Sequence, residues 1–274
     1  MASLLRLLGL IFAGTLVAFF LLSLFLARWA TKPVEESWRA QRQFVSDASH
    51  ELKTPLAVIT ANVDLLDRYG SQREEKEQRW LENIRASSGE MSELVEELLT
   101  LARSDNQSKK DLVHGTVDWS ELVEESVLLF EAPLLEADRP LEDHIAPGIT
   151  VSGDPAKLRR LTEILLDNAR KYAQPHTTVT LRLEREGGKR ARLSVNTKGK
   201  PIPPEQRERI FERFYRSDQA RSSEGFGLGL AIAQAVAREH KGKLWLESSE
   251  AQGNTFCFSL PLTSKEMNHY YSGK

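Results

Sequence analysis

The sequence has little cysteine and little net charge, and each shortage excludes a class of protein. A single cysteine, Cys257, stands among 274 residues, so an intrachain disulfide framework or a thiolate metal cluster is excluded. It lies in the alternating run NTFCFSLPL, where a small buried thiol is the expected role. Lysine and arginine total 37 against 39 acidic residues, a net charge of -2, which argues against direct nucleic-acid binding.

Long apolar runs are also scarce, with one exception near the N-terminus. Leu7 to Ala27 is an unbroken apolar run of 21 residues, enough to cross a hydrocarbon core of about 30 Å. A signal peptide is the competing interpretation, but its apolar region would be shorter and a small-residue cleavage site would follow. Arg28 and Lys32 against Arg6 favour a single span with the main body of the chain in the cytoplasm.

The segment FVSDASHELKTPLAVITANVDLL, residues 44–66, has the periodicity of an amphipathic helix. His50 lies off its apolar stripe, about 200° from Ala48 and Leu52, and is expected to face solvent. Pro55 removes a backbone donor and should bend the helix just beyond His50. The stripe itself consists of Phe44, Ala48, Leu52, Leu56, Ile59, Val63 and Leu66.

A second helix is expected to return alongside the first. The first should run from about Val34 to Arg68, turn at residues 69–71, and be followed by a helix over about residues 73–104. One helical hairpin has too little core to bury both apolar stripes, whereas two hairpins packed as a four-helix bundle bury them. The pattern therefore predicts a homodimer.

After residue 110 the pattern alternates as in half-buried strands. Strands are expected at TVTLRLERE, ARLSVNT, KLWLESS and NTFCFSLPL, interleaved with helices at about 120–135, 155–173, 204–213 and 228–241. This order predicts an α/β sandwich with one layer of helices.

One of these helices carries a candidate nucleotide platform. Asp154 is a predicted N-cap, and Asn168, Lys171 and Tyr172 share one face further along the helix. An amide for hydrated Mg²⁺, a cation for phosphate and an aromatic ring for a base suit a nucleotide, although an ordinary helix surface is equally compatible. Gly225, Gly227 and Gly229 then precede a helix whose free amides could hold phosphates, after a polar loop suited to a lid, residues 217–224.

The string SHELKTPL, residues 49–56, resembles the phospho-acceptor box of bacterial sensor histidine kinases. The resemblance implies that His50 is phosphorylated on a ring nitrogen and that Glu51 holds or deprotonates the imidazole. General-base help of this kind is worth roughly 10²- to 10⁴-fold in rate. It also implies that Thr54 orients a water that dephosphorylates the partner protein.

Later motifs resemble the ATP-binding domain of the same family, in the family's order. They are LLDNARKYA, IFERFYRSD and GFGLGL, the last spanning residues 225–230. The resemblance implies that Asn168 is the Mg²⁺ ligand. The residues that it assigns to ATP and Mg²⁺ are Asn168, Lys171, Tyr172, Asn196, Thr197, Gly199, Phe211, Phe214, Arg216, Gly225, Gly227, Leu228, Gly229, Leu230 and Thr255.

One motif departs from the family pattern. In VNTKGKPIPPE, Thr197 stands where the family has the aspartate that accepts a hydrogen bond from the adenine amino group, and Pro201 replaces a glycine. Asn196 after a one-residue slip, or the Thr197 hydroxyl, could supply the acceptor. A lost bond would cost about 0.5 to 3 kcal/mol.

The sequence thus predicts an α+β multidomain protein. We expect a transmembrane anchor (1–28), a juxtamembrane linker (29–43), a dimeric helical-hairpin phospho-acceptor domain (44–106), a GHKL-type α/β sandwich that binds ATP (112–262) and a tail (263–274). The predicted function is ATP-Mg²⁺ autophosphorylation of His50, transfer to an aspartate of a response regulator receiver domain, and dephosphorylation of that regulator.

The predicted location is the bacterial inner membrane, with the kinase domains in the cytoplasm. Expected partners are membrane lipid, a second copy of the chain and the receiver domain. With about six residues before the span, sensing would use the membrane helix, a membrane partner or a missing N-terminal region. A catalytically weak scaffold or phosphatase is the alternative. An ATP-hydrolysing clamp of the gyrase and chaperone kind is disfavoured, because Ile164 occupies the position of its catalytic glutamate.

Overall fold

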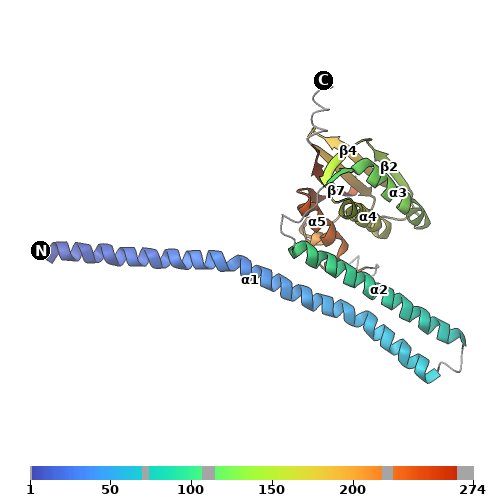
Figure 1. The fold of residues 1–274 in the computed structure, drawn as a ribbon, viewed down its shortest axis with the longest axis horizontal. Coiled ribbons are helices and arrows are strands. Elements are labelled where there is room, and N and C mark those ends of the chain that lie inside the picture. The colour runs from blue at the N-terminus through green and yellow to red at the C-terminus, as the bar shows by residue number, and fades with distance from the viewer. Residues whose placement is uncertain (1, 70–73, 107–114, 218–224, 264–274) are drawn as a thin grey trace. The chain divides into compact units, whose positions relative to one another are not determined.

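The computed structural model describes residues 2–69, 74–106, 115–217 and 225–263 (Figure 1). The chain divides into two units, Met1–Thr54 and Pro55–Lys274. The predicted turn at residues 70–71, the lid at 218–224 and the tail beyond residue 263 lie outside the described residues.

Two long helices begin the chain. Helix α1 spans Ala2–Tyr69 and helix α2 spans Glu74–Asn106. Helix α1 continues through Pro33 and Pro55, so the expected helix start at about Val34 is wrong and residues 28–37 are helical. Each proline costs a single backbone hydrogen bond, and the long helical flanks on both sides tolerate that loss.

The N-terminal part of α1 carries exposed apolar side chains. Among the described ones from Leu10 to Leu26, the large apolar side chains are each at least 43% exposed. No helix in the searched residues of the structure meets the length and hydropathy needed to cross a membrane.

Within the second unit, the end of α1 and helix α2 form the two arms of a hairpin. The Asn83 side chain donates from Nδ2 to Asn62 Oδ1 at 3.2 Å, and Asn62 and Leu94 are buried. Other apolar side chains of these helices remain uncovered in a single copy. They include Leu56, Val58, Val63 and Leu65 of α1 and Leu81, Val95 and Leu99 of α2, which are 38% to 51% exposed.

The remaining chain is an α/β sandwich. A five-stranded sheet has the order β2-β4-β5-β7-β6, with β2 parallel to β4 and the other pairs antiparallel. A second sheet pairs β1 with β3. The strand bounds are β1 Gly115–Asp118, β2 Leu141–Ile145, β3 Thr150–Gly153, β4 Val179–Glu186, β5 Arg190–Thr197, β6 Lys243–Ser249 and β7 Gly253–Pro261.

Three helices cover one face of the large sheet (Figure 1). They are α3 Trp119–Glu136, α4 Pro155–Tyr172 and α5 Gly229–Glu239. Alternate residues of the central strands, such as Leu181, Leu193 and Val195, are fully buried against this layer, while their neighbours are not. This alternation is typical of a sheet with one covered face.

The predicted helix at 204–213 is wrong, because that segment forms two short 3₁₀ turns. They are η1 Pro204–Gln206 and η2 Arg209–Phe211. Pro203 and Pro204 lack backbone donors, and Glu212 already has an extended conformation that ends the second turn.

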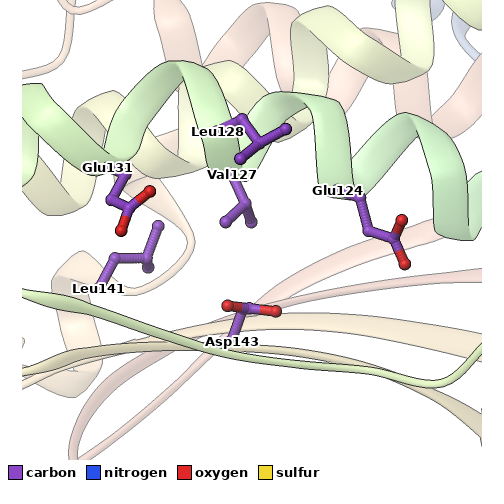
Figure 2. A pocket seen from close by; sticks show the side chains of 6 residues that line it. All are labelled: Glu124, Val127, Leu128, Glu131, Leu141 and Asp143. Atoms are coloured by element: carbon purple, nitrogen blue, oxygen red, sulfur yellow. The ribbon is translucent and has the colours of Figure 1, made fainter.

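A cavity of about 280 Å³ lies between α3 and the edge strand β2, as Figure 2 shows. Its lining combines carboxylates with apolar side chains: Glu124, Val127, Leu128, Glu131, Leu141 and Asp143. Leu128 is 71% exposed at its rim. This acidic cavity has no cationic lining residue among those described, and it differs in that respect from the larger pocket beside α4.

The single cysteine is buried within the sheet. Cys257 lies on β7 with 1% of its surface exposed, and burial raises the pKa of its thiol to about 12. The thiol is therefore protonated at neutral pH and is a structural side chain, as its alternating sequence predicts.

Candidate functional site

A cavity of about 680 Å³ opens between α4, the ends of β5 and β7, and the segment leading to α5. That volume falls in the range of small-ligand sites. Its described lining residues are Asn168, Lys171, Tyr172, Ala173, Gln174, Pro175, Thr197, Gly199, Lys200, Ile202, Ile210, Tyr215, Arg216, Ser217, Gly227, Leu230, Asn254 and Phe256.

Helix α4 forms one wall of this pocket. Asp154 caps the helix by accepting hydrogen bonds from the Ala156 and Lys157 amides at 2.9 and 3.3 Å. Leu158, Leu161 and Leu165 are fully buried beneath it, so the polar face with Asn168, Lys171 and Tyr172 turns to the cavity.

The Lys171 ammonium is positioned by two neighbours. Its Nζ lies 2.7 Å from Asp167 Oδ2, one helical turn earlier. A Cβ added to Gly225 would lie 3.4 Å from the same Nζ, so the glycine backbone lies beside the cation. Asp167 was not predicted as a site residue, although its i,i+4 spacing to Lys171 is a sequence signal for such a pair.

The glycine segment passes close to the aromatic segment before it. Gly227 has φ 73°, and an added Cβ would lie 2.9 Å from the Tyr215 carbonyl oxygen. The Phe214 amide donates to the Gly227 carbonyl at 3.1 Å. Only glycine meets both the left-handed conformation and the close approach at this position.

The opposite end of the pocket is buried and mostly apolar. Thr197 and Phe256 are 6% and 5% exposed, and Phe211 packs edge-on against Phe256 from behind, with ring centroids 6.4 Å apart. Ile202 and Ile210 complete this end. A flat apolar ring would fit here better than a charged group.

Strand alternation separates the two candidates for the hydrogen-bond acceptor. Thr197 lines the cavity, whereas the Asn196 amide donates to the Gln252 carbonyl at 3.0 Å and to Thr255 Oγ1 at 2.7 Å, outside the lining. Asn254 is held by Ser248, which donates to its Oδ1 at 2.7 Å. Of the two alternatives, the pocket contains Thr197.

Eight of the residues predicted to bind nucleotide line the pocket, and the others lie around it. The lining members are Asn168, Lys171, Tyr172, Thr197, Gly199, Arg216, Gly227 and Leu230; the surrounding ones are Asn196, Phe211, Phe214, Gly225, Leu228, Gly229 and Thr255. Lys200, Ile210 and Phe256 line the pocket but were not predicted. Lys171, Lys200 and Arg216 are its cations, and none of its described lining residues is acidic.

The predicted phospho-acceptor lies on α1. His50 is exposed on this helix. Glu51 is half-buried beside it, and Thr54, one turn further on, is exposed. Such a ring nitrogen is accessible to a reacting group.

Several curated proteins are similar to this chain. Sensor protein DltS of Streptococcus agalactiae is 34% identical over 239 residues, which cover 86% of this chain and 59% of DltS. Signal transduction histidine-protein kinase/phosphatase MprB of Mycobacterium tuberculosis is 36% identical over 227 residues, covering 81% of this chain and 44% of MprB. The chain thus spans about half the length of the curated relatives that it matches.

Two family models match separate parts of the chain. The His Kinase A (phospho-acceptor) domain matches residues 40–107, which include His50. The histidine kinase-, DNA gyrase B-, and HSP90-like ATPase model matches residues 153–264, which form the pocket. The chain thus contains the two domains that these models describe, and it is similar to bacterial sensor histidine kinases. The acceptor helix and the ATPase fold are both present.

Solved histidine kinases share the fold. The structure of histidine kinase ThkA in complex with response regulator protein TrrA has a TM-score of 0.66 and 23% identity, covering 84% of this chain and 64% of that one. Acinetobacter baumannii histidine kinase AdeS has a TM-score of 0.59 and 24% identity, covering 78% of this chain and 97% of that one. At these identities the likeness concerns the fold alone.

Proposed function

We propose that this chain is an ATP-dependent protein histidine kinase that phosphorylates His50. The observation that carries the proposal is the pocket, in which Lys171, Lys200 and Arg216 occur without an acidic residue in the described lining. Such a lining suits a polyanion, and the apolar end suits its base. His50 is the exposed acceptor on the helix that carries the phospho-acceptor motif.

In the proposed reaction a ring nitrogen of His50 attacks the γ-phosphorus of ATP in line. The bond between that phosphorus and the oxygen bridging to the β-phosphate breaks, and ADP leaves with the oxygen. The imidazole proton passes to the Glu51 carboxylate. Because phosphoryl transfer depends mostly on positioning and charge, Lys171 contributes by offsetting charge on the phosphates.

The residues present fit a Mg²⁺ ion that takes most of its ligands from phosphate and water. Asn168 lines the cavity and carries one amide oxygen, whereas both Asp167 oxygens already bind cations, Arg170 and Lys171. No group of three or more His, Cys, Asp or Glu side chains in the searched part of the chain could hold a metal by itself. Mg²⁺ bound with a nucleotide needs no such group. When bound, it would neutralise phosphate charge.

The phosphoryl group then passes from His50 to an aspartate of a response regulator receiver domain. ThkA has been solved in complex with response regulator protein TrrA, and MprB is named as a kinase and a phosphatase, which supports both phosphorylation and dephosphorylation of a regulator here. Thr54 is exposed on the same face of α1 as His50, at i,i+4 spacing. There it would orient the water that dephosphorylates the regulator.

The chain is proposed to act as a homodimer anchored in the bacterial inner membrane. The uncovered apolar side chains of α1 and α2 support a second hairpin that completes a four-helix bundle. The apolar run Leu7 to Ala27, whose described large apolar side chains are exposed, supports the anchor, which would contact lipid and could contact a membrane sensing partner. The domains after it would lie in the cytoplasm.

The full chain, reconstituted in lipid, would be incubated with γ-labelled ATP and Mg²⁺ beside His50→Gln. We expect label that is acid-labile and alkali-stable in the unchanged chain, and none in the variant. Label that survives acid, or that persists in the variant, would contradict the proposal. If neither chain is labelled although both fold and dimerise, the scaffold or phosphatase alternative replaces it.

A further inference from the structure

The polar group at the buried end of the pocket is the Thr197 hydroxyl, which can either donate or accept a hydrogen bond. Thr197 closes strand β5, and its Oγ1 donates to the Asn254 carbonyl oxygen at 3.3 Å. Hydroxyl hydrogen bonds in proteins are usually about 2.7 to 2.8 Å long, so this bond is a weak restraint on the hydroxyl. A threonine hydroxyl carries one donor and two acceptor positions and can rotate between partners.

The neighbouring polar side chains already make hydrogen bonds to protein groups. Asn254 accepts from Ser248 Oγ at 2.7 Å through Oδ1 and donates to the Lys200 carbonyl at 3.0 Å through Nδ2. The amide nitrogen of Asn196 is bound on the far side of the strand. Among the described residues at this end, the Thr197 hydroxyl is therefore the buried polar group that can adjust to a base.

Purine bases differ in what they present to such a group. Adenine carries a 6-amino donor and guanine a 6-oxo acceptor. The hydroxyl can accept from the amino group while it keeps its bond to Asn254, or rotate and donate to the oxo group after giving up a weak bond. A carboxylate at this position would accept a hydrogen bond from the adenine amino group and repel the guanine oxo group. The described lining of the pocket, however, contains no Asp or Glu.

We infer that the pocket accepts purine nucleoside triphosphates with little discrimination between adenine and guanine, and that Thr197 sets this tolerance. The inference rests on the proposed function, since it assumes that the pocket binds a nucleoside triphosphate. It defines the substrate class more closely: ATP and GTP compete for one site, and the base contributes stacking and apolar contact more than hydrogen-bond selection.

Competition binding tests this inference without relying on phosphoryl transfer. Full-length chain in detergent would be loaded with a fluorescent trinitrophenyl-ATP probe and Mg²⁺, and the probe displaced by ATP or GTP. We expect the half-displacing concentrations of the two nucleotides to agree within about tenfold, the equivalent of about 1.4 kcal/mol.

Substitutions at residue 197 test whether the lack of a fixed acceptor there explains the tolerance. Thr197→Asp supplies a fixed charged acceptor, so the preference for ATP over GTP should rise by about tenfold or more. Thr197→Val removes the hydroxyl at similar shape and should leave the ratio near that of the unchanged chain. Ser194→Asp is the matched control: it adds the same charge on the same strand, outside the pocket lining, and should not move the ratio.

Each outcome decides between the two proposals. Displacement by ATP with GTP more than about tenfold weaker would overturn the inference and leave the kinase proposal standing. Thr197→Asp that melts like the unchanged chain yet keeps its ATP to GTP ratio would also overturn it. Failure of the probe and of both nucleotides to bind the correctly folded chain would contradict the kinase proposal as well.

Discussion

At the scale of single residues, His240 connects two helices of the sandwich. It is 3% exposed, its Nδ1 lies 2.8 Å from the Val236 carbonyl, and its Nε2 accepts from the Asp154 amide at 3.0 Å. These bonds require a neutral ring with the proton on Nδ1. His240 thus fixes the start of α4, the helix that carries Asn168 and Lys171, against the end of α5.

Replacing His240 by alanine should cost about 2 to 4 kcal/mol of unfolding free energy. The variant loses two buried hydrogen bonds, leaves the Asp154 amide without this acceptor and opens a cavity. Denaturant unfolding would measure it, with His144→Ala as the control, because that side chain is 44% exposed and should change stability by less than about 0.5 kcal/mol. Equal stability of the two variants would contradict this role.

Gly227 should be essential for nucleotide binding but not for folding. Gly227→Ala forces a side chain into a left-handed backbone and to 2.9 Å from the Tyr215 carbonyl, so the segment beside the pocket must shift. We expect nucleotide affinity to fall about tenfold or more. Gly115→Ala, whose new Cβ meets open space, should bind as the unchanged chain does; equal affinity of both variants would contradict this account.

The residues that line the pocket could be predicted only in part from the sequence. The sequence indicates that an acceptor lies at Asn196 or Thr197, but a one-residue slip reverses which side chain faces inward. The register of β5 with β7, Thr197 opposite Asn254 and Asn196 opposite Thr255, decides it. Phe256 comes from β7 and reaches the pocket only through that register, so no local pattern predicts it, whereas Lys200 stands three residues after Thr197 in the same motif.

At the scale of elements, long periodic segments were predictable and short ones were not. Strands β4 to β7 and helices α3 to α5 follow the alternation and helical spacing of their sequences. Strands β1, β2 and β3 have only four or five residues and were missed, because so short a run carries no resolvable period. The strand β2 in turn forms one wall of the acidic cavity in Figure 2.

A buried carboxyl between α2 and α4 should make the stability of the folded unit depend on pH. Glu97 of α2 is 12% exposed, and burial raises its pKa to about 7. The nearby carboxylates of Glu93 and Asp167 raise this pKa further. Lys171 and Arg160, whose guanidinium lies 3.7 Å from Glu97, lower it. Glu97 is therefore partly protonated at neutral pH.

This shift makes the folded unit less stable as pH rises. The unfolded carboxyl releases its proton near pH 4.5, whereas the folded one keeps it until about pH 7. The contribution of Glu97 to the free energy of unfolding is thus largest below pH 4.5. It falls by about 3 kcal/mol as the pH rises from 4.5 through 7. Glu97→Gln should remove this slope in denaturant unfolding from pH 5 to 8, whereas Glu96→Gln, exposed on the same helix, should keep it. A slope that survives Glu97→Gln would contradict the assignment.

At the scale of the whole molecule, assembly should depend on the uncovered apolar face of the hairpin. Val63→Glu places a charge on this face, at a side chain that is 44% exposed in one copy, and should convert the dimer to monomers at micromolar concentration. Ala61→Glu, about 160° away around α1, should leave the dimer intact. Sedimentation velocity in detergent would distinguish them; dimers of both variants would contradict the predicted bundle.

The central claim is that ATP bound in the pocket phosphorylates His50. Its most direct test is phosphopeptide mapping by mass spectrometry under alkaline conditions, after incubation with ATP and Mg²⁺, of the unchanged chain and of Asn168→Ala. We expect phosphate on His50 in the unchanged chain and its loss in Asn168→Ala, which removes the amide proposed to bind Mg²⁺. Phosphate on another residue, or equal His50 phosphorylation in both chains, would contradict it.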